Sequence, residues 1–152
     1  MRHLIVLATL TAILGTTGAA AQTAADTAAI RATALDYIEG WYEGNAERMD
    51  RALHPDLAKR VVAPGTGAVQ HMTKDQLVQA TGRGGGRMTP AEQQRKDVTI
   101  LDIYGNAAVV KVVAADWVDY LQIGKTDGRW VIINVLWEFT PEAKARMQQG
   151  RR

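Results

Sequence analysis

The amino-acid sequence predicts an α+β fold, with helices in the N-terminal half of the chain and an antiparallel sheet in the C-terminal half. Apolar residues recur at helical spacing from Ala24 to Gly44. From Val98 onward, short apolar runs flank Gly105-Asn106 and Asp127-Gly128, dipeptides that are typical of tight hairpin turns. Helices followed by an uninterrupted set of strands are typical of α+β proteins.

Three helices are predicted before the sheet. The first is Ala24–Gly44, whose last residue can adopt the left-handed conformation that ends many helices. Asn45 can cap a second, short helix over Ala46–Leu53. The third opens at the capping box Thr73-x-x-Gln76 and ends near Ala80. The strands that follow are predicted to form a four-stranded antiparallel meander.

Length and composition indicate one globular domain. The chain has 152 residues, of which 47% are hydrophobic and 22% charged, and its formal net charge is +2. The basic residues are scattered and form no stripe with interleaved aromatic residues, so no nucleic-acid partner is expected. The chain has no cysteine, which excludes disulfides and leaves the apolar core to hold the fold together.

The first 21 residues have the pattern of a secretory signal peptide. A basic start is followed by the apolar run Leu4–Leu14 and by Ala19-Ala20-Ala21, which fits a cleavage site. The run is shorter than the roughly 20 residues that a spanning helix needs, so an uncleaved anchor is the weaker alternative. We therefore expect a periplasmic or secreted protein, not bound to a membrane after cleavage. Residues 22–140 would form the domain, and residues 141–152 a polar, fraying tail.

Residues 82–90 are rich in glycine and are predicted to form a flexible flap or linker. The segment TGRGGGRMTPAE lacks the spacing of a phosphate-binding loop, and no strand is predicted directly before it. An anion site in this loop is therefore the less favoured alternative.

The last hairpin raises the question of what covers the sheet. A two-residue turn at Asp127-Gly128 would pair Leu121 with Asn134 and Asp119 with Leu136, so that these four side chains share one face. The other face would be almost entirely apolar and would include Val131, Ile133, Val135 and Trp137. A slip of one residue would exchange the faces. We expect helices over the first face and a second copy of the chain over the other.

Asp119 and Asn134 are polar residues on a face that is expected to be buried. Because burying such groups without partners costs a few kcal/mol, they either pair locally or line a wet pocket between the sheet and a helix. The residues alone leave both possibilities open.

Three segments of the chain resemble the nuclear transport factor 2-like (NTF2-like) superfamily. They are YIEGWYEGNAERMDRALHPDLAKR, VTILDIYGNAAVVKV and DYLQIGKTDGRWVIINVLW. The likeness extends from about Ala28 to Phe139 and is strongest to the "putative lumazine-binding" branch, near the SnoaL-like proteins. It implies a cone, in which a bent antiparallel sheet wraps around a long N-terminal helix and leaves a pocket at the open end. It also implies a homodimer formed through the outer sheet face.

The resemblance implies no single activity, because related cones include enzymes and plain binding domains. The first hypothesis is a non-catalytic binder of a small apolar or aromatic molecule, with candidate ligand-binding residues Tyr37, Trp41, His54, Asp119, Asn134 and Leu136. The second is an acid–base enzyme, such as an isomerase or dehydratase, with Asp119 as base and Tyr37 or His54 as proton donor. The third is a dimeric interaction module whose pocket is packed shut by Trp41, Trp130 and Leu136.

Other catalytic patterns are weak or missing in the sequence. His54-Pro55-Asp56 is compatible with a His–Asp dyad, but the favoured interpretation is a histidine that fixes a turn by bonding the backbone, with Asp56 exposed. The sequence contains neither H-E-x-x-H nor G-x-S-x-G, and it has no thiol nucleophile. We therefore expect no metal and no cofactor.

Overall fold

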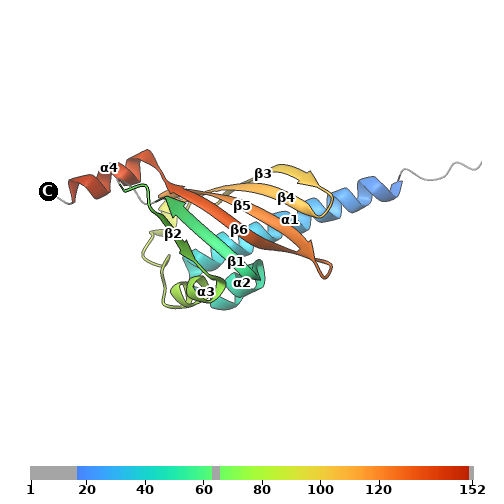
Figure 1. Cartoon of the computed structure of the whole chain (residues 1–152), viewed down its shortest axis with the longest axis horizontal. Helices are drawn as coiled ribbons and strands as arrows, with labels where there is room; N and C mark the ends of the chain where they lie inside the picture. The colour runs from blue at the N-terminus through green and yellow to red at the C-terminus, as the bar shows by residue number, and fades with distance from the viewer. Residues whose placement is uncertain (1–16, 63–65, 151–152) are drawn as a thin grey trace, which may run out of the picture.

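The computed structural model describes residues 17–62 and 66–150 as helices packed against one curved sheet (Figure 1). In chain order the elements are α1 (Thr17–Glu43), α2 (Ala46–Ala52), β1 (Leu53–Val62), β2 (Val69–Met72), α3 (Lys74–Gly82), the 3-10 turn η1 (Ala91–Gln93), β3 (Asp97–Tyr104), β4 (Ala107–Val113), β5 (Trp117–Thr126), β6 (Arg129–Phe139) and α4 (Pro141–Gln149). The predicted α+β class is confirmed. Within the described ranges, no helix is long and apolar enough to cross a membrane. The predicted signal peptide lies outside these ranges except for residues 17–21, which begin α1.

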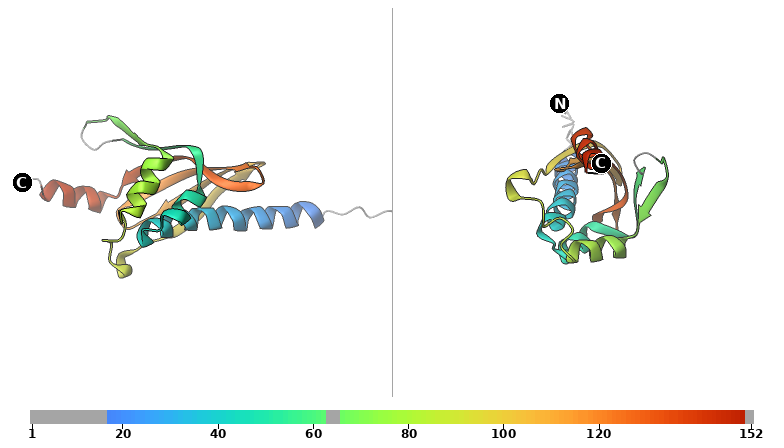
Figure 2. Two further views of the ribbon diagram at one scale, coloured as in Figure 1. Left: turned by 90° about the horizontal axis from the view of Figure 1, so that it is seen from below. Right: turned by 90° about the vertical axis from the view of Figure 1, so that its left-hand side faces the viewer.

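The six strands form a single sheet in the order β2-β1-β6-β5-β4-β3, which curves around α1 (Figure 2). Strands β3 to β6 form the predicted antiparallel meander. Strand β1 joins this meander parallel to β6, and β2 pairs with β1 at the edge. The sheet is therefore larger than the predicted meander, because the segment around DLAKRVV belongs to a full strand.

The hairpin between β5 and β6 has the predicted turn but not the predicted register. Asp127 and Gly128 have φ angles of 50° and 76°, as a type I′ turn requires. The expected pairing continues to Ile123 opposite Ile132, and then the register shifts by one residue. The shift is a β-bulge, in which Ile133 is the extra residue of β6.

The bulge reverses the faces that we predicted for the second half of β6. Leu121 pairs with Val135 rather than with Asn134, and Asp119 pairs with Trp137 rather than with Leu136. Because side chains alternate along a strand, the shift turns the side chains of Val135, Trp137 and Phe139 inward and those of Asn134, Leu136 and Glu138 outward. The predicted apolar outer stripe was therefore wrong, since Val135 and Trp137 belong to the inner face.

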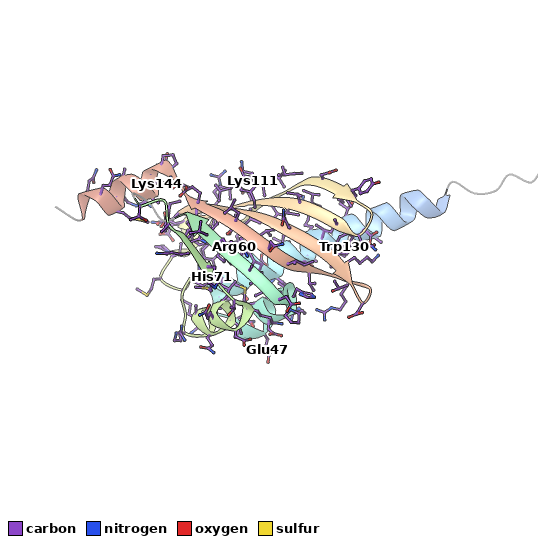
Figure 3. All side chains as sticks on the ribbon, viewed as in Figure 1. Glu47, Arg60, His71, Lys111, Trp130 and Lys144 are labelled. Atoms are coloured by element: carbon purple, nitrogen blue, oxygen red, sulfur yellow. The ribbon has the colours of Figure 1, made fainter. Side chains whose placement is uncertain are left out.

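The outer face of the sheet is mixed in character. Strand pairing aligns one row of residues across all six strands: His71, Arg60, Leu136, Tyr120, Lys111 and Thr99. Figure 3 labels the three basic members of this row, Arg60, His71 and Lys111. Leu136 and Tyr120 lie at its centre and are 55% and 44% exposed.

The helices cover the inner face. Ile30, Ala34 and Ile38 of α1 are fully buried in the core, and the hydroxyl of Thr33 donates to the carbonyl of Trp130 in β6 at 2.8 Å. Arg48 of α2 forms ion pairs with three acidic side chains of α1: Asp36, Glu39 and Glu43. These contacts hold α2 against the C-terminal half of α1.

Most of the predicted polar tail forms a helix, α4, over Pro141–Gln149. The Thr140 hydroxyl accepts a hydrogen bond from the backbone N–H of Ala143, and Pro141 occupies the first turn of α4. A hydroxyl cap followed by proline is a typical helix start, and Ala143 is buried. The start signal was thus present in the sequence, although the polar composition of the tail suggested otherwise.

Candidate functional site

A cavity of about 240 Å³ lies between the C-terminal half of α1 and the inner face of the sheet. The residues that line it are Tyr37, Ile38, Trp41, Met49, Lys59, Met72, Leu77, Trp117, Trp137 and Phe139. They come from both layers of the fold, since α1, α2 and α3 supply one side and β1, β2, β5 and β6 the other. Apart from Lys59, every lining residue is apolar or aromatic.

Aromatic rings form much of the cavity wall. Trp41 of α1 meets Trp117 of β5 edge to face, with ring centroids 6.4 Å apart. Trp137 and Phe139 of β6 meet in the same way at 4.7 Å. The last two rings reach the cavity because the bulge at Ile133 turns this part of β6 inward. Walls of this kind suit a flat, largely apolar molecule.

One polar cluster interrupts this apolar wall, and we call its four members the Lys59 cluster: Lys59, Asp119, Tyr37 and Trp117. Lys59 Nζ donates to Asp119 Oδ1 at 2.8 Å and to Tyr37 Oη at 2.5 Å. Trp117 Nε1 donates to Asp119 Oδ2 at 2.6 Å. The side chain of Asp119 is 0% exposed and that of Lys59 is 12% exposed. Each charge is therefore paired inside the protein, as burial requires.

Strand alternation explains why a lysine faces the interior. Leu57, Lys59 and Val61 share one side of β1, and both apolar neighbours are buried. Asp119 occupies an inward position of β5, opposite Trp137. Lys59 was not among the site residues predicted from the sequence, although a charged residue between two apolar residues at strand spacing is a detectable signal.

The cluster also fixes the protonation state of Tyr37. Burial raises the pKa of its hydroxyl well above the usual 10.0, and the nearby Asp119 carboxylate, to which it is hydrogen-bonded, raises this pKa further. The hydroxyl therefore stays neutral at physiological pH. It accepts a hydrogen bond from Lys59, so its role in the cluster is to hold both charged groups in place.

Lys59 is the one charged residue among those that line this cavity. Asp119 is absent from the cavity lining, and its two oxygens are occupied by Lys59 and Trp117. A carboxylate bound in this way is poorly placed to remove a proton from a ligand. The arrangement is better suited to hold an acceptor atom of a ligand at Lys59 Nζ.

Comparison with known sequences assigns this chain to a family. A family model described as "Putative lumazine-binding" matches residues 25–138. This chain belongs to that family. The match covers most of the domain that was predicted for residues 22–140, and it confirms the resemblance on which the expected cone rested. No curated protein matches this chain.

Solved structures of other proteins have the same fold as this chain. An NTF2-like protein from Silicibacter pomeroyi superposes with a TM-score of 0.61 at 15% identity, covering 78% of this chain and 98% of its own. An NTF2-like protein with a cystatin-like fold from Novosphingobium aromaticivorans gives 0.61 at 15% identity, with coverages of 88% and 97%. One from Methylobacillus flagellatus gives 0.60 at 23% identity, with coverages of 76% and 93%. At these identities the similarity establishes the fold alone.

The structure brings together three of the six residues that were predicted to bind a ligand in this family member. Tyr37 and Trp41 line the cavity, and Asp119 lies behind Lys59. Asn134 and Leu136 are instead on the outer face, because of the bulge in β6. The three residues that were expected to close the pocket, Trp41, Trp130 and Leu136, do not meet there, since only Trp41 lines the cavity.

His54 lies away from this cavity, in a separate polar groove near the turn between β5 and β6. Its Nδ1 accepts a hydrogen bond from the backbone N–H of Asp56 at 3.1 Å, and the side chain of Asp56 is 90% exposed. These contacts fit a histidine that fixes the local backbone. The structure does not place His54 next to Asp119 or Tyr37. Among the described residues, no group of three or more potential ligands could hold a metal ion.

The glycine-rich segment supports one wall of the cavity. A Cβ atom on Gly86 would lie 2.4 Å from the carbonyl oxygen of Trp41, and one on Gly85 would lie 2.4 Å from the indole ring. Arg87 Nε donates to the carbonyl of Glu43 at the end of α1. This segment, predicted as a flap or linker, therefore packs closely on Trp41, and its glycines permit that approach.

Proposed function

We propose that this protein binds a small, flat, largely apolar molecule in the cavity between α1 and the sheet. The observation that carries the proposal is the cavity itself, with aromatic walls and one charged group among otherwise apolar lining residues. Ligand sites in proteins are usually apolar cavities of this kind, with a few polar groups that orient the ligand. The family description supports ligand binding in coarse terms.

Binding fits the site better than acid–base catalysis by Asp119. The catalytic alternative requires a carboxylate that can reach the ligand, whereas Asp119 is fully buried and bonded to Lys59 and Trp117. It also requires a donor beside that carboxylate, and the Tyr37 hydroxyl already bonds within the cluster. Both groups would have to give up buried hydrogen bonds before they could act on a ligand.

We also propose that binding takes place outside the cytoplasm and in a homodimer. The pattern of the first 21 residues supports export to the periplasm or the medium. The exposed Tyr120 and Leu136 at the centre of the outer sheet face support pairing of two copies through that face.

Native mass spectrometry of the protein, purified from the periplasm of an exporting host, tests the binding function. We expect a reproducible extra mass on the wild-type protein and its loss from Met72→Trp, because Met72 lines the cavity and a larger side chain would fill it. The matched control is Met147→Trp on α4, where the methionine is 40% exposed and outside the cavity. The same extra mass on Met72→Trp, or no bound mass and no binding of added apolar probes, would overturn the proposal.

A further inference from the structure

We propose that the cavity selects neutral ligands that carry a carbonyl or a similar uncharged oxygen acceptor, and that Lys59 Nζ donates the hydrogen bond that anchors this oxygen. The inference rests on the proposed binding function and names the chemical class of its ligand. It follows from the number of donors on Lys59, from the charge balance of the Lys59 cluster and from the rigidity of its surroundings.

The donor count leaves one N–H of Lys59 for a ligand. A lysine ammonium has three N–H donors. Two are used, on Asp119 Oδ1 and Tyr37 Oη, and within the described part of the chain no third acceptor is bonded to Nζ. Lys59 belongs to the cavity lining, so a bound molecule can offer the missing acceptor.

The charge balance favours a neutral acceptor over an anionic one. Lys59 and Asp119 form a buried ion pair in which the charges cancel. A carboxylate ligand would add a second negative charge to a cavity whose other lining residues are uncharged. Desolvating that charge without a second cation is costly, whereas a carbonyl oxygen accepts the hydrogen bond at a much smaller desolvation cost.

The surroundings of Lys59 hold the donor in place before a ligand arrives. Its Nζ lies 5.2 Å from the ring centroid of Tyr37 and 5.1 Å from that of Trp137, so both rings also stabilise the cation. Asp119 is fixed in turn by the indole N–H of Trp117. A ligand oxygen therefore meets a donor that is already oriented, which lowers the entropic cost of binding.

Three probes with one skeleton test this selectivity on the wild-type protein. They are 2-acetylnaphthalene, which has a neutral carbonyl, 2-naphthoate, which is anionic, and 2-ethylnaphthalene, which has no acceptor. A hydrogen bond from a charged donor is worth enough to give about a tenfold or greater difference in Kd. We expect isothermal titration to rank 2-acetylnaphthalene at least about tenfold tighter than each of the other two.

Paired variants assign the preference to Lys59. The double variant Lys59→Met/Asp119→Asn removes both charges together, so no unpaired buried charge remains, and we expect it to lose the preference for 2-acetylnaphthalene over 2-ethylnaphthalene. The control is Lys125→Met/Asp26→Asn. This Lys–Asp pair is likewise joined by a tryptophan N–H and lies outside the cavity, with Lys125 and Trp130 both donating to Asp26 Oδ1 at 2.8 and 2.9 Å. We expect the control variant to keep the preference.

The possible outcomes distinguish the proposal about the ligand class from the proposal about the binding function. Equal affinities of wild type for the acetyl and ethyl probes, or tightest binding of 2-naphthoate, would overturn the ligand class and leave the binding function standing. Retention of the acetyl preference in Lys59→Met/Asp119→Asn would overturn the role of Lys59. Failure of all three probes to bind wild type, together with no bound mass in native mass spectrometry, would overturn the binding function itself. The wild-type comparison decides the ligand class even where the double variant does not fold.

Discussion

Tyr37 connects the core of the protein to the buried ion pair of Lys59 and Asp119. The residue is 3% exposed, and its hydroxyl accepts a hydrogen bond from Lys59 beside Asp119. We expect Tyr37→Phe to lower the free energy of unfolding by about 1–3 kcal/mol, because the substitution leaves polar groups inside the protein without a partner. Denaturant unfolding followed by circular dichroism measures the change. The matched control is Tyr104→Phe, where the tyrosine is 85% exposed. If Tyr104→Phe lost as much unfolding free energy as Tyr37→Phe, the stabilising role of the Tyr37 hydroxyl would be contradicted.

The same residue has a pH signature. Burial first, and then Asp119, raise the pKa of Tyr37 well above 10.0 in the folded protein. In the unfolded chain the hydroxyl ionises near pH 10, so the folded state keeps a proton that the unfolded state has lost. The contribution of Tyr37 to stability is therefore complete below about pH 10 and is lost as the pH rises toward its folded pKa. Between about pH 9 and about pH 11, we expect the free energy of unfolding to fall less in Tyr37→Phe than in wild type, because the variant lacks this titrating hydroxyl.

The sequence predicted part of the site at the residue scale. Tyr37 and Trp41 were found because the helical stripe of α1 places them on its inner side, and Asp119 was found because it interrupts an apolar strand. Lys59 was missed because the predicted sheet began at Val98, so no inner face was assigned to the segment around Lys59. Recognising β1 requires its pairing with β6, which is distant in the sequence.

The bulge at Ile133 shows why strand content is easier to predict than strand faces. The meander and the type I′ turn follow from local residue types, and the pairing near the turn was predicted correctly. A bulge adds one residue to one strand, and this is enough to exchange Asn134 and Leu136 with Val135 and Trp137. The bulge depends on packing between the strands: Gly124, which pairs with Val131, leaves room for the Ile133 side chain, whose Cδ1 would lie 2.5 Å from a Cβ atom on Gly124.

The glycine-rich segment is the element with the sharpest steric requirement. Because a Cβ atom on Gly86 would lie 2.4 Å from a backbone oxygen of Trp41, the loop or α1 must shift in Gly86→Ala. We expect this variant to lose about 1–3 kcal/mol of unfolding free energy and to bind 2-ethylnaphthalene more weakly, because Trp41 is a cavity wall. The control is Gly82→Ala, whose added atom would meet Ala46 at 3.5 Å, an ordinary contact. Equal stability and binding in the two variants would show that the close approach is unimportant.

At the scale of the whole molecule, two Lys–Asp–Trp arrangements join distant elements. Lys125 and Trp130 bond to Asp26 and hold the N-terminal half of α1 to the hairpin of β5 and β6, while lowering the pKa of Asp26. The Lys59 cluster lies toward the other end of these strands and joins β1 and β5 to α1. Both arrangements hold α1 to the sheet. The Asp26 arrangement lies outside the cavity, whereas the Lys59 cluster borders it, so only the Lys59 cluster can offer a hydrogen-bond donor to a ligand in the cavity.

The proposed homodimer contact lies on the outer sheet face. Leu136 and Tyr120 stand at the centre of a face whose remaining row members are polar or basic, so a substitution there should act on assembly and not on the core. We expect the wild type to sediment as a dimer at micromolar concentration and Leu136→Arg to sediment as a monomer, because two like charges would oppose each other across a symmetric contact. Met88→Arg is the control, since Met88 is 90% exposed in the glycine-rich segment and should leave the dimer intact. A wild-type monomer at that concentration would remove the dimer from the proposal, and a dimeric Leu136→Arg would move the contact away from this face.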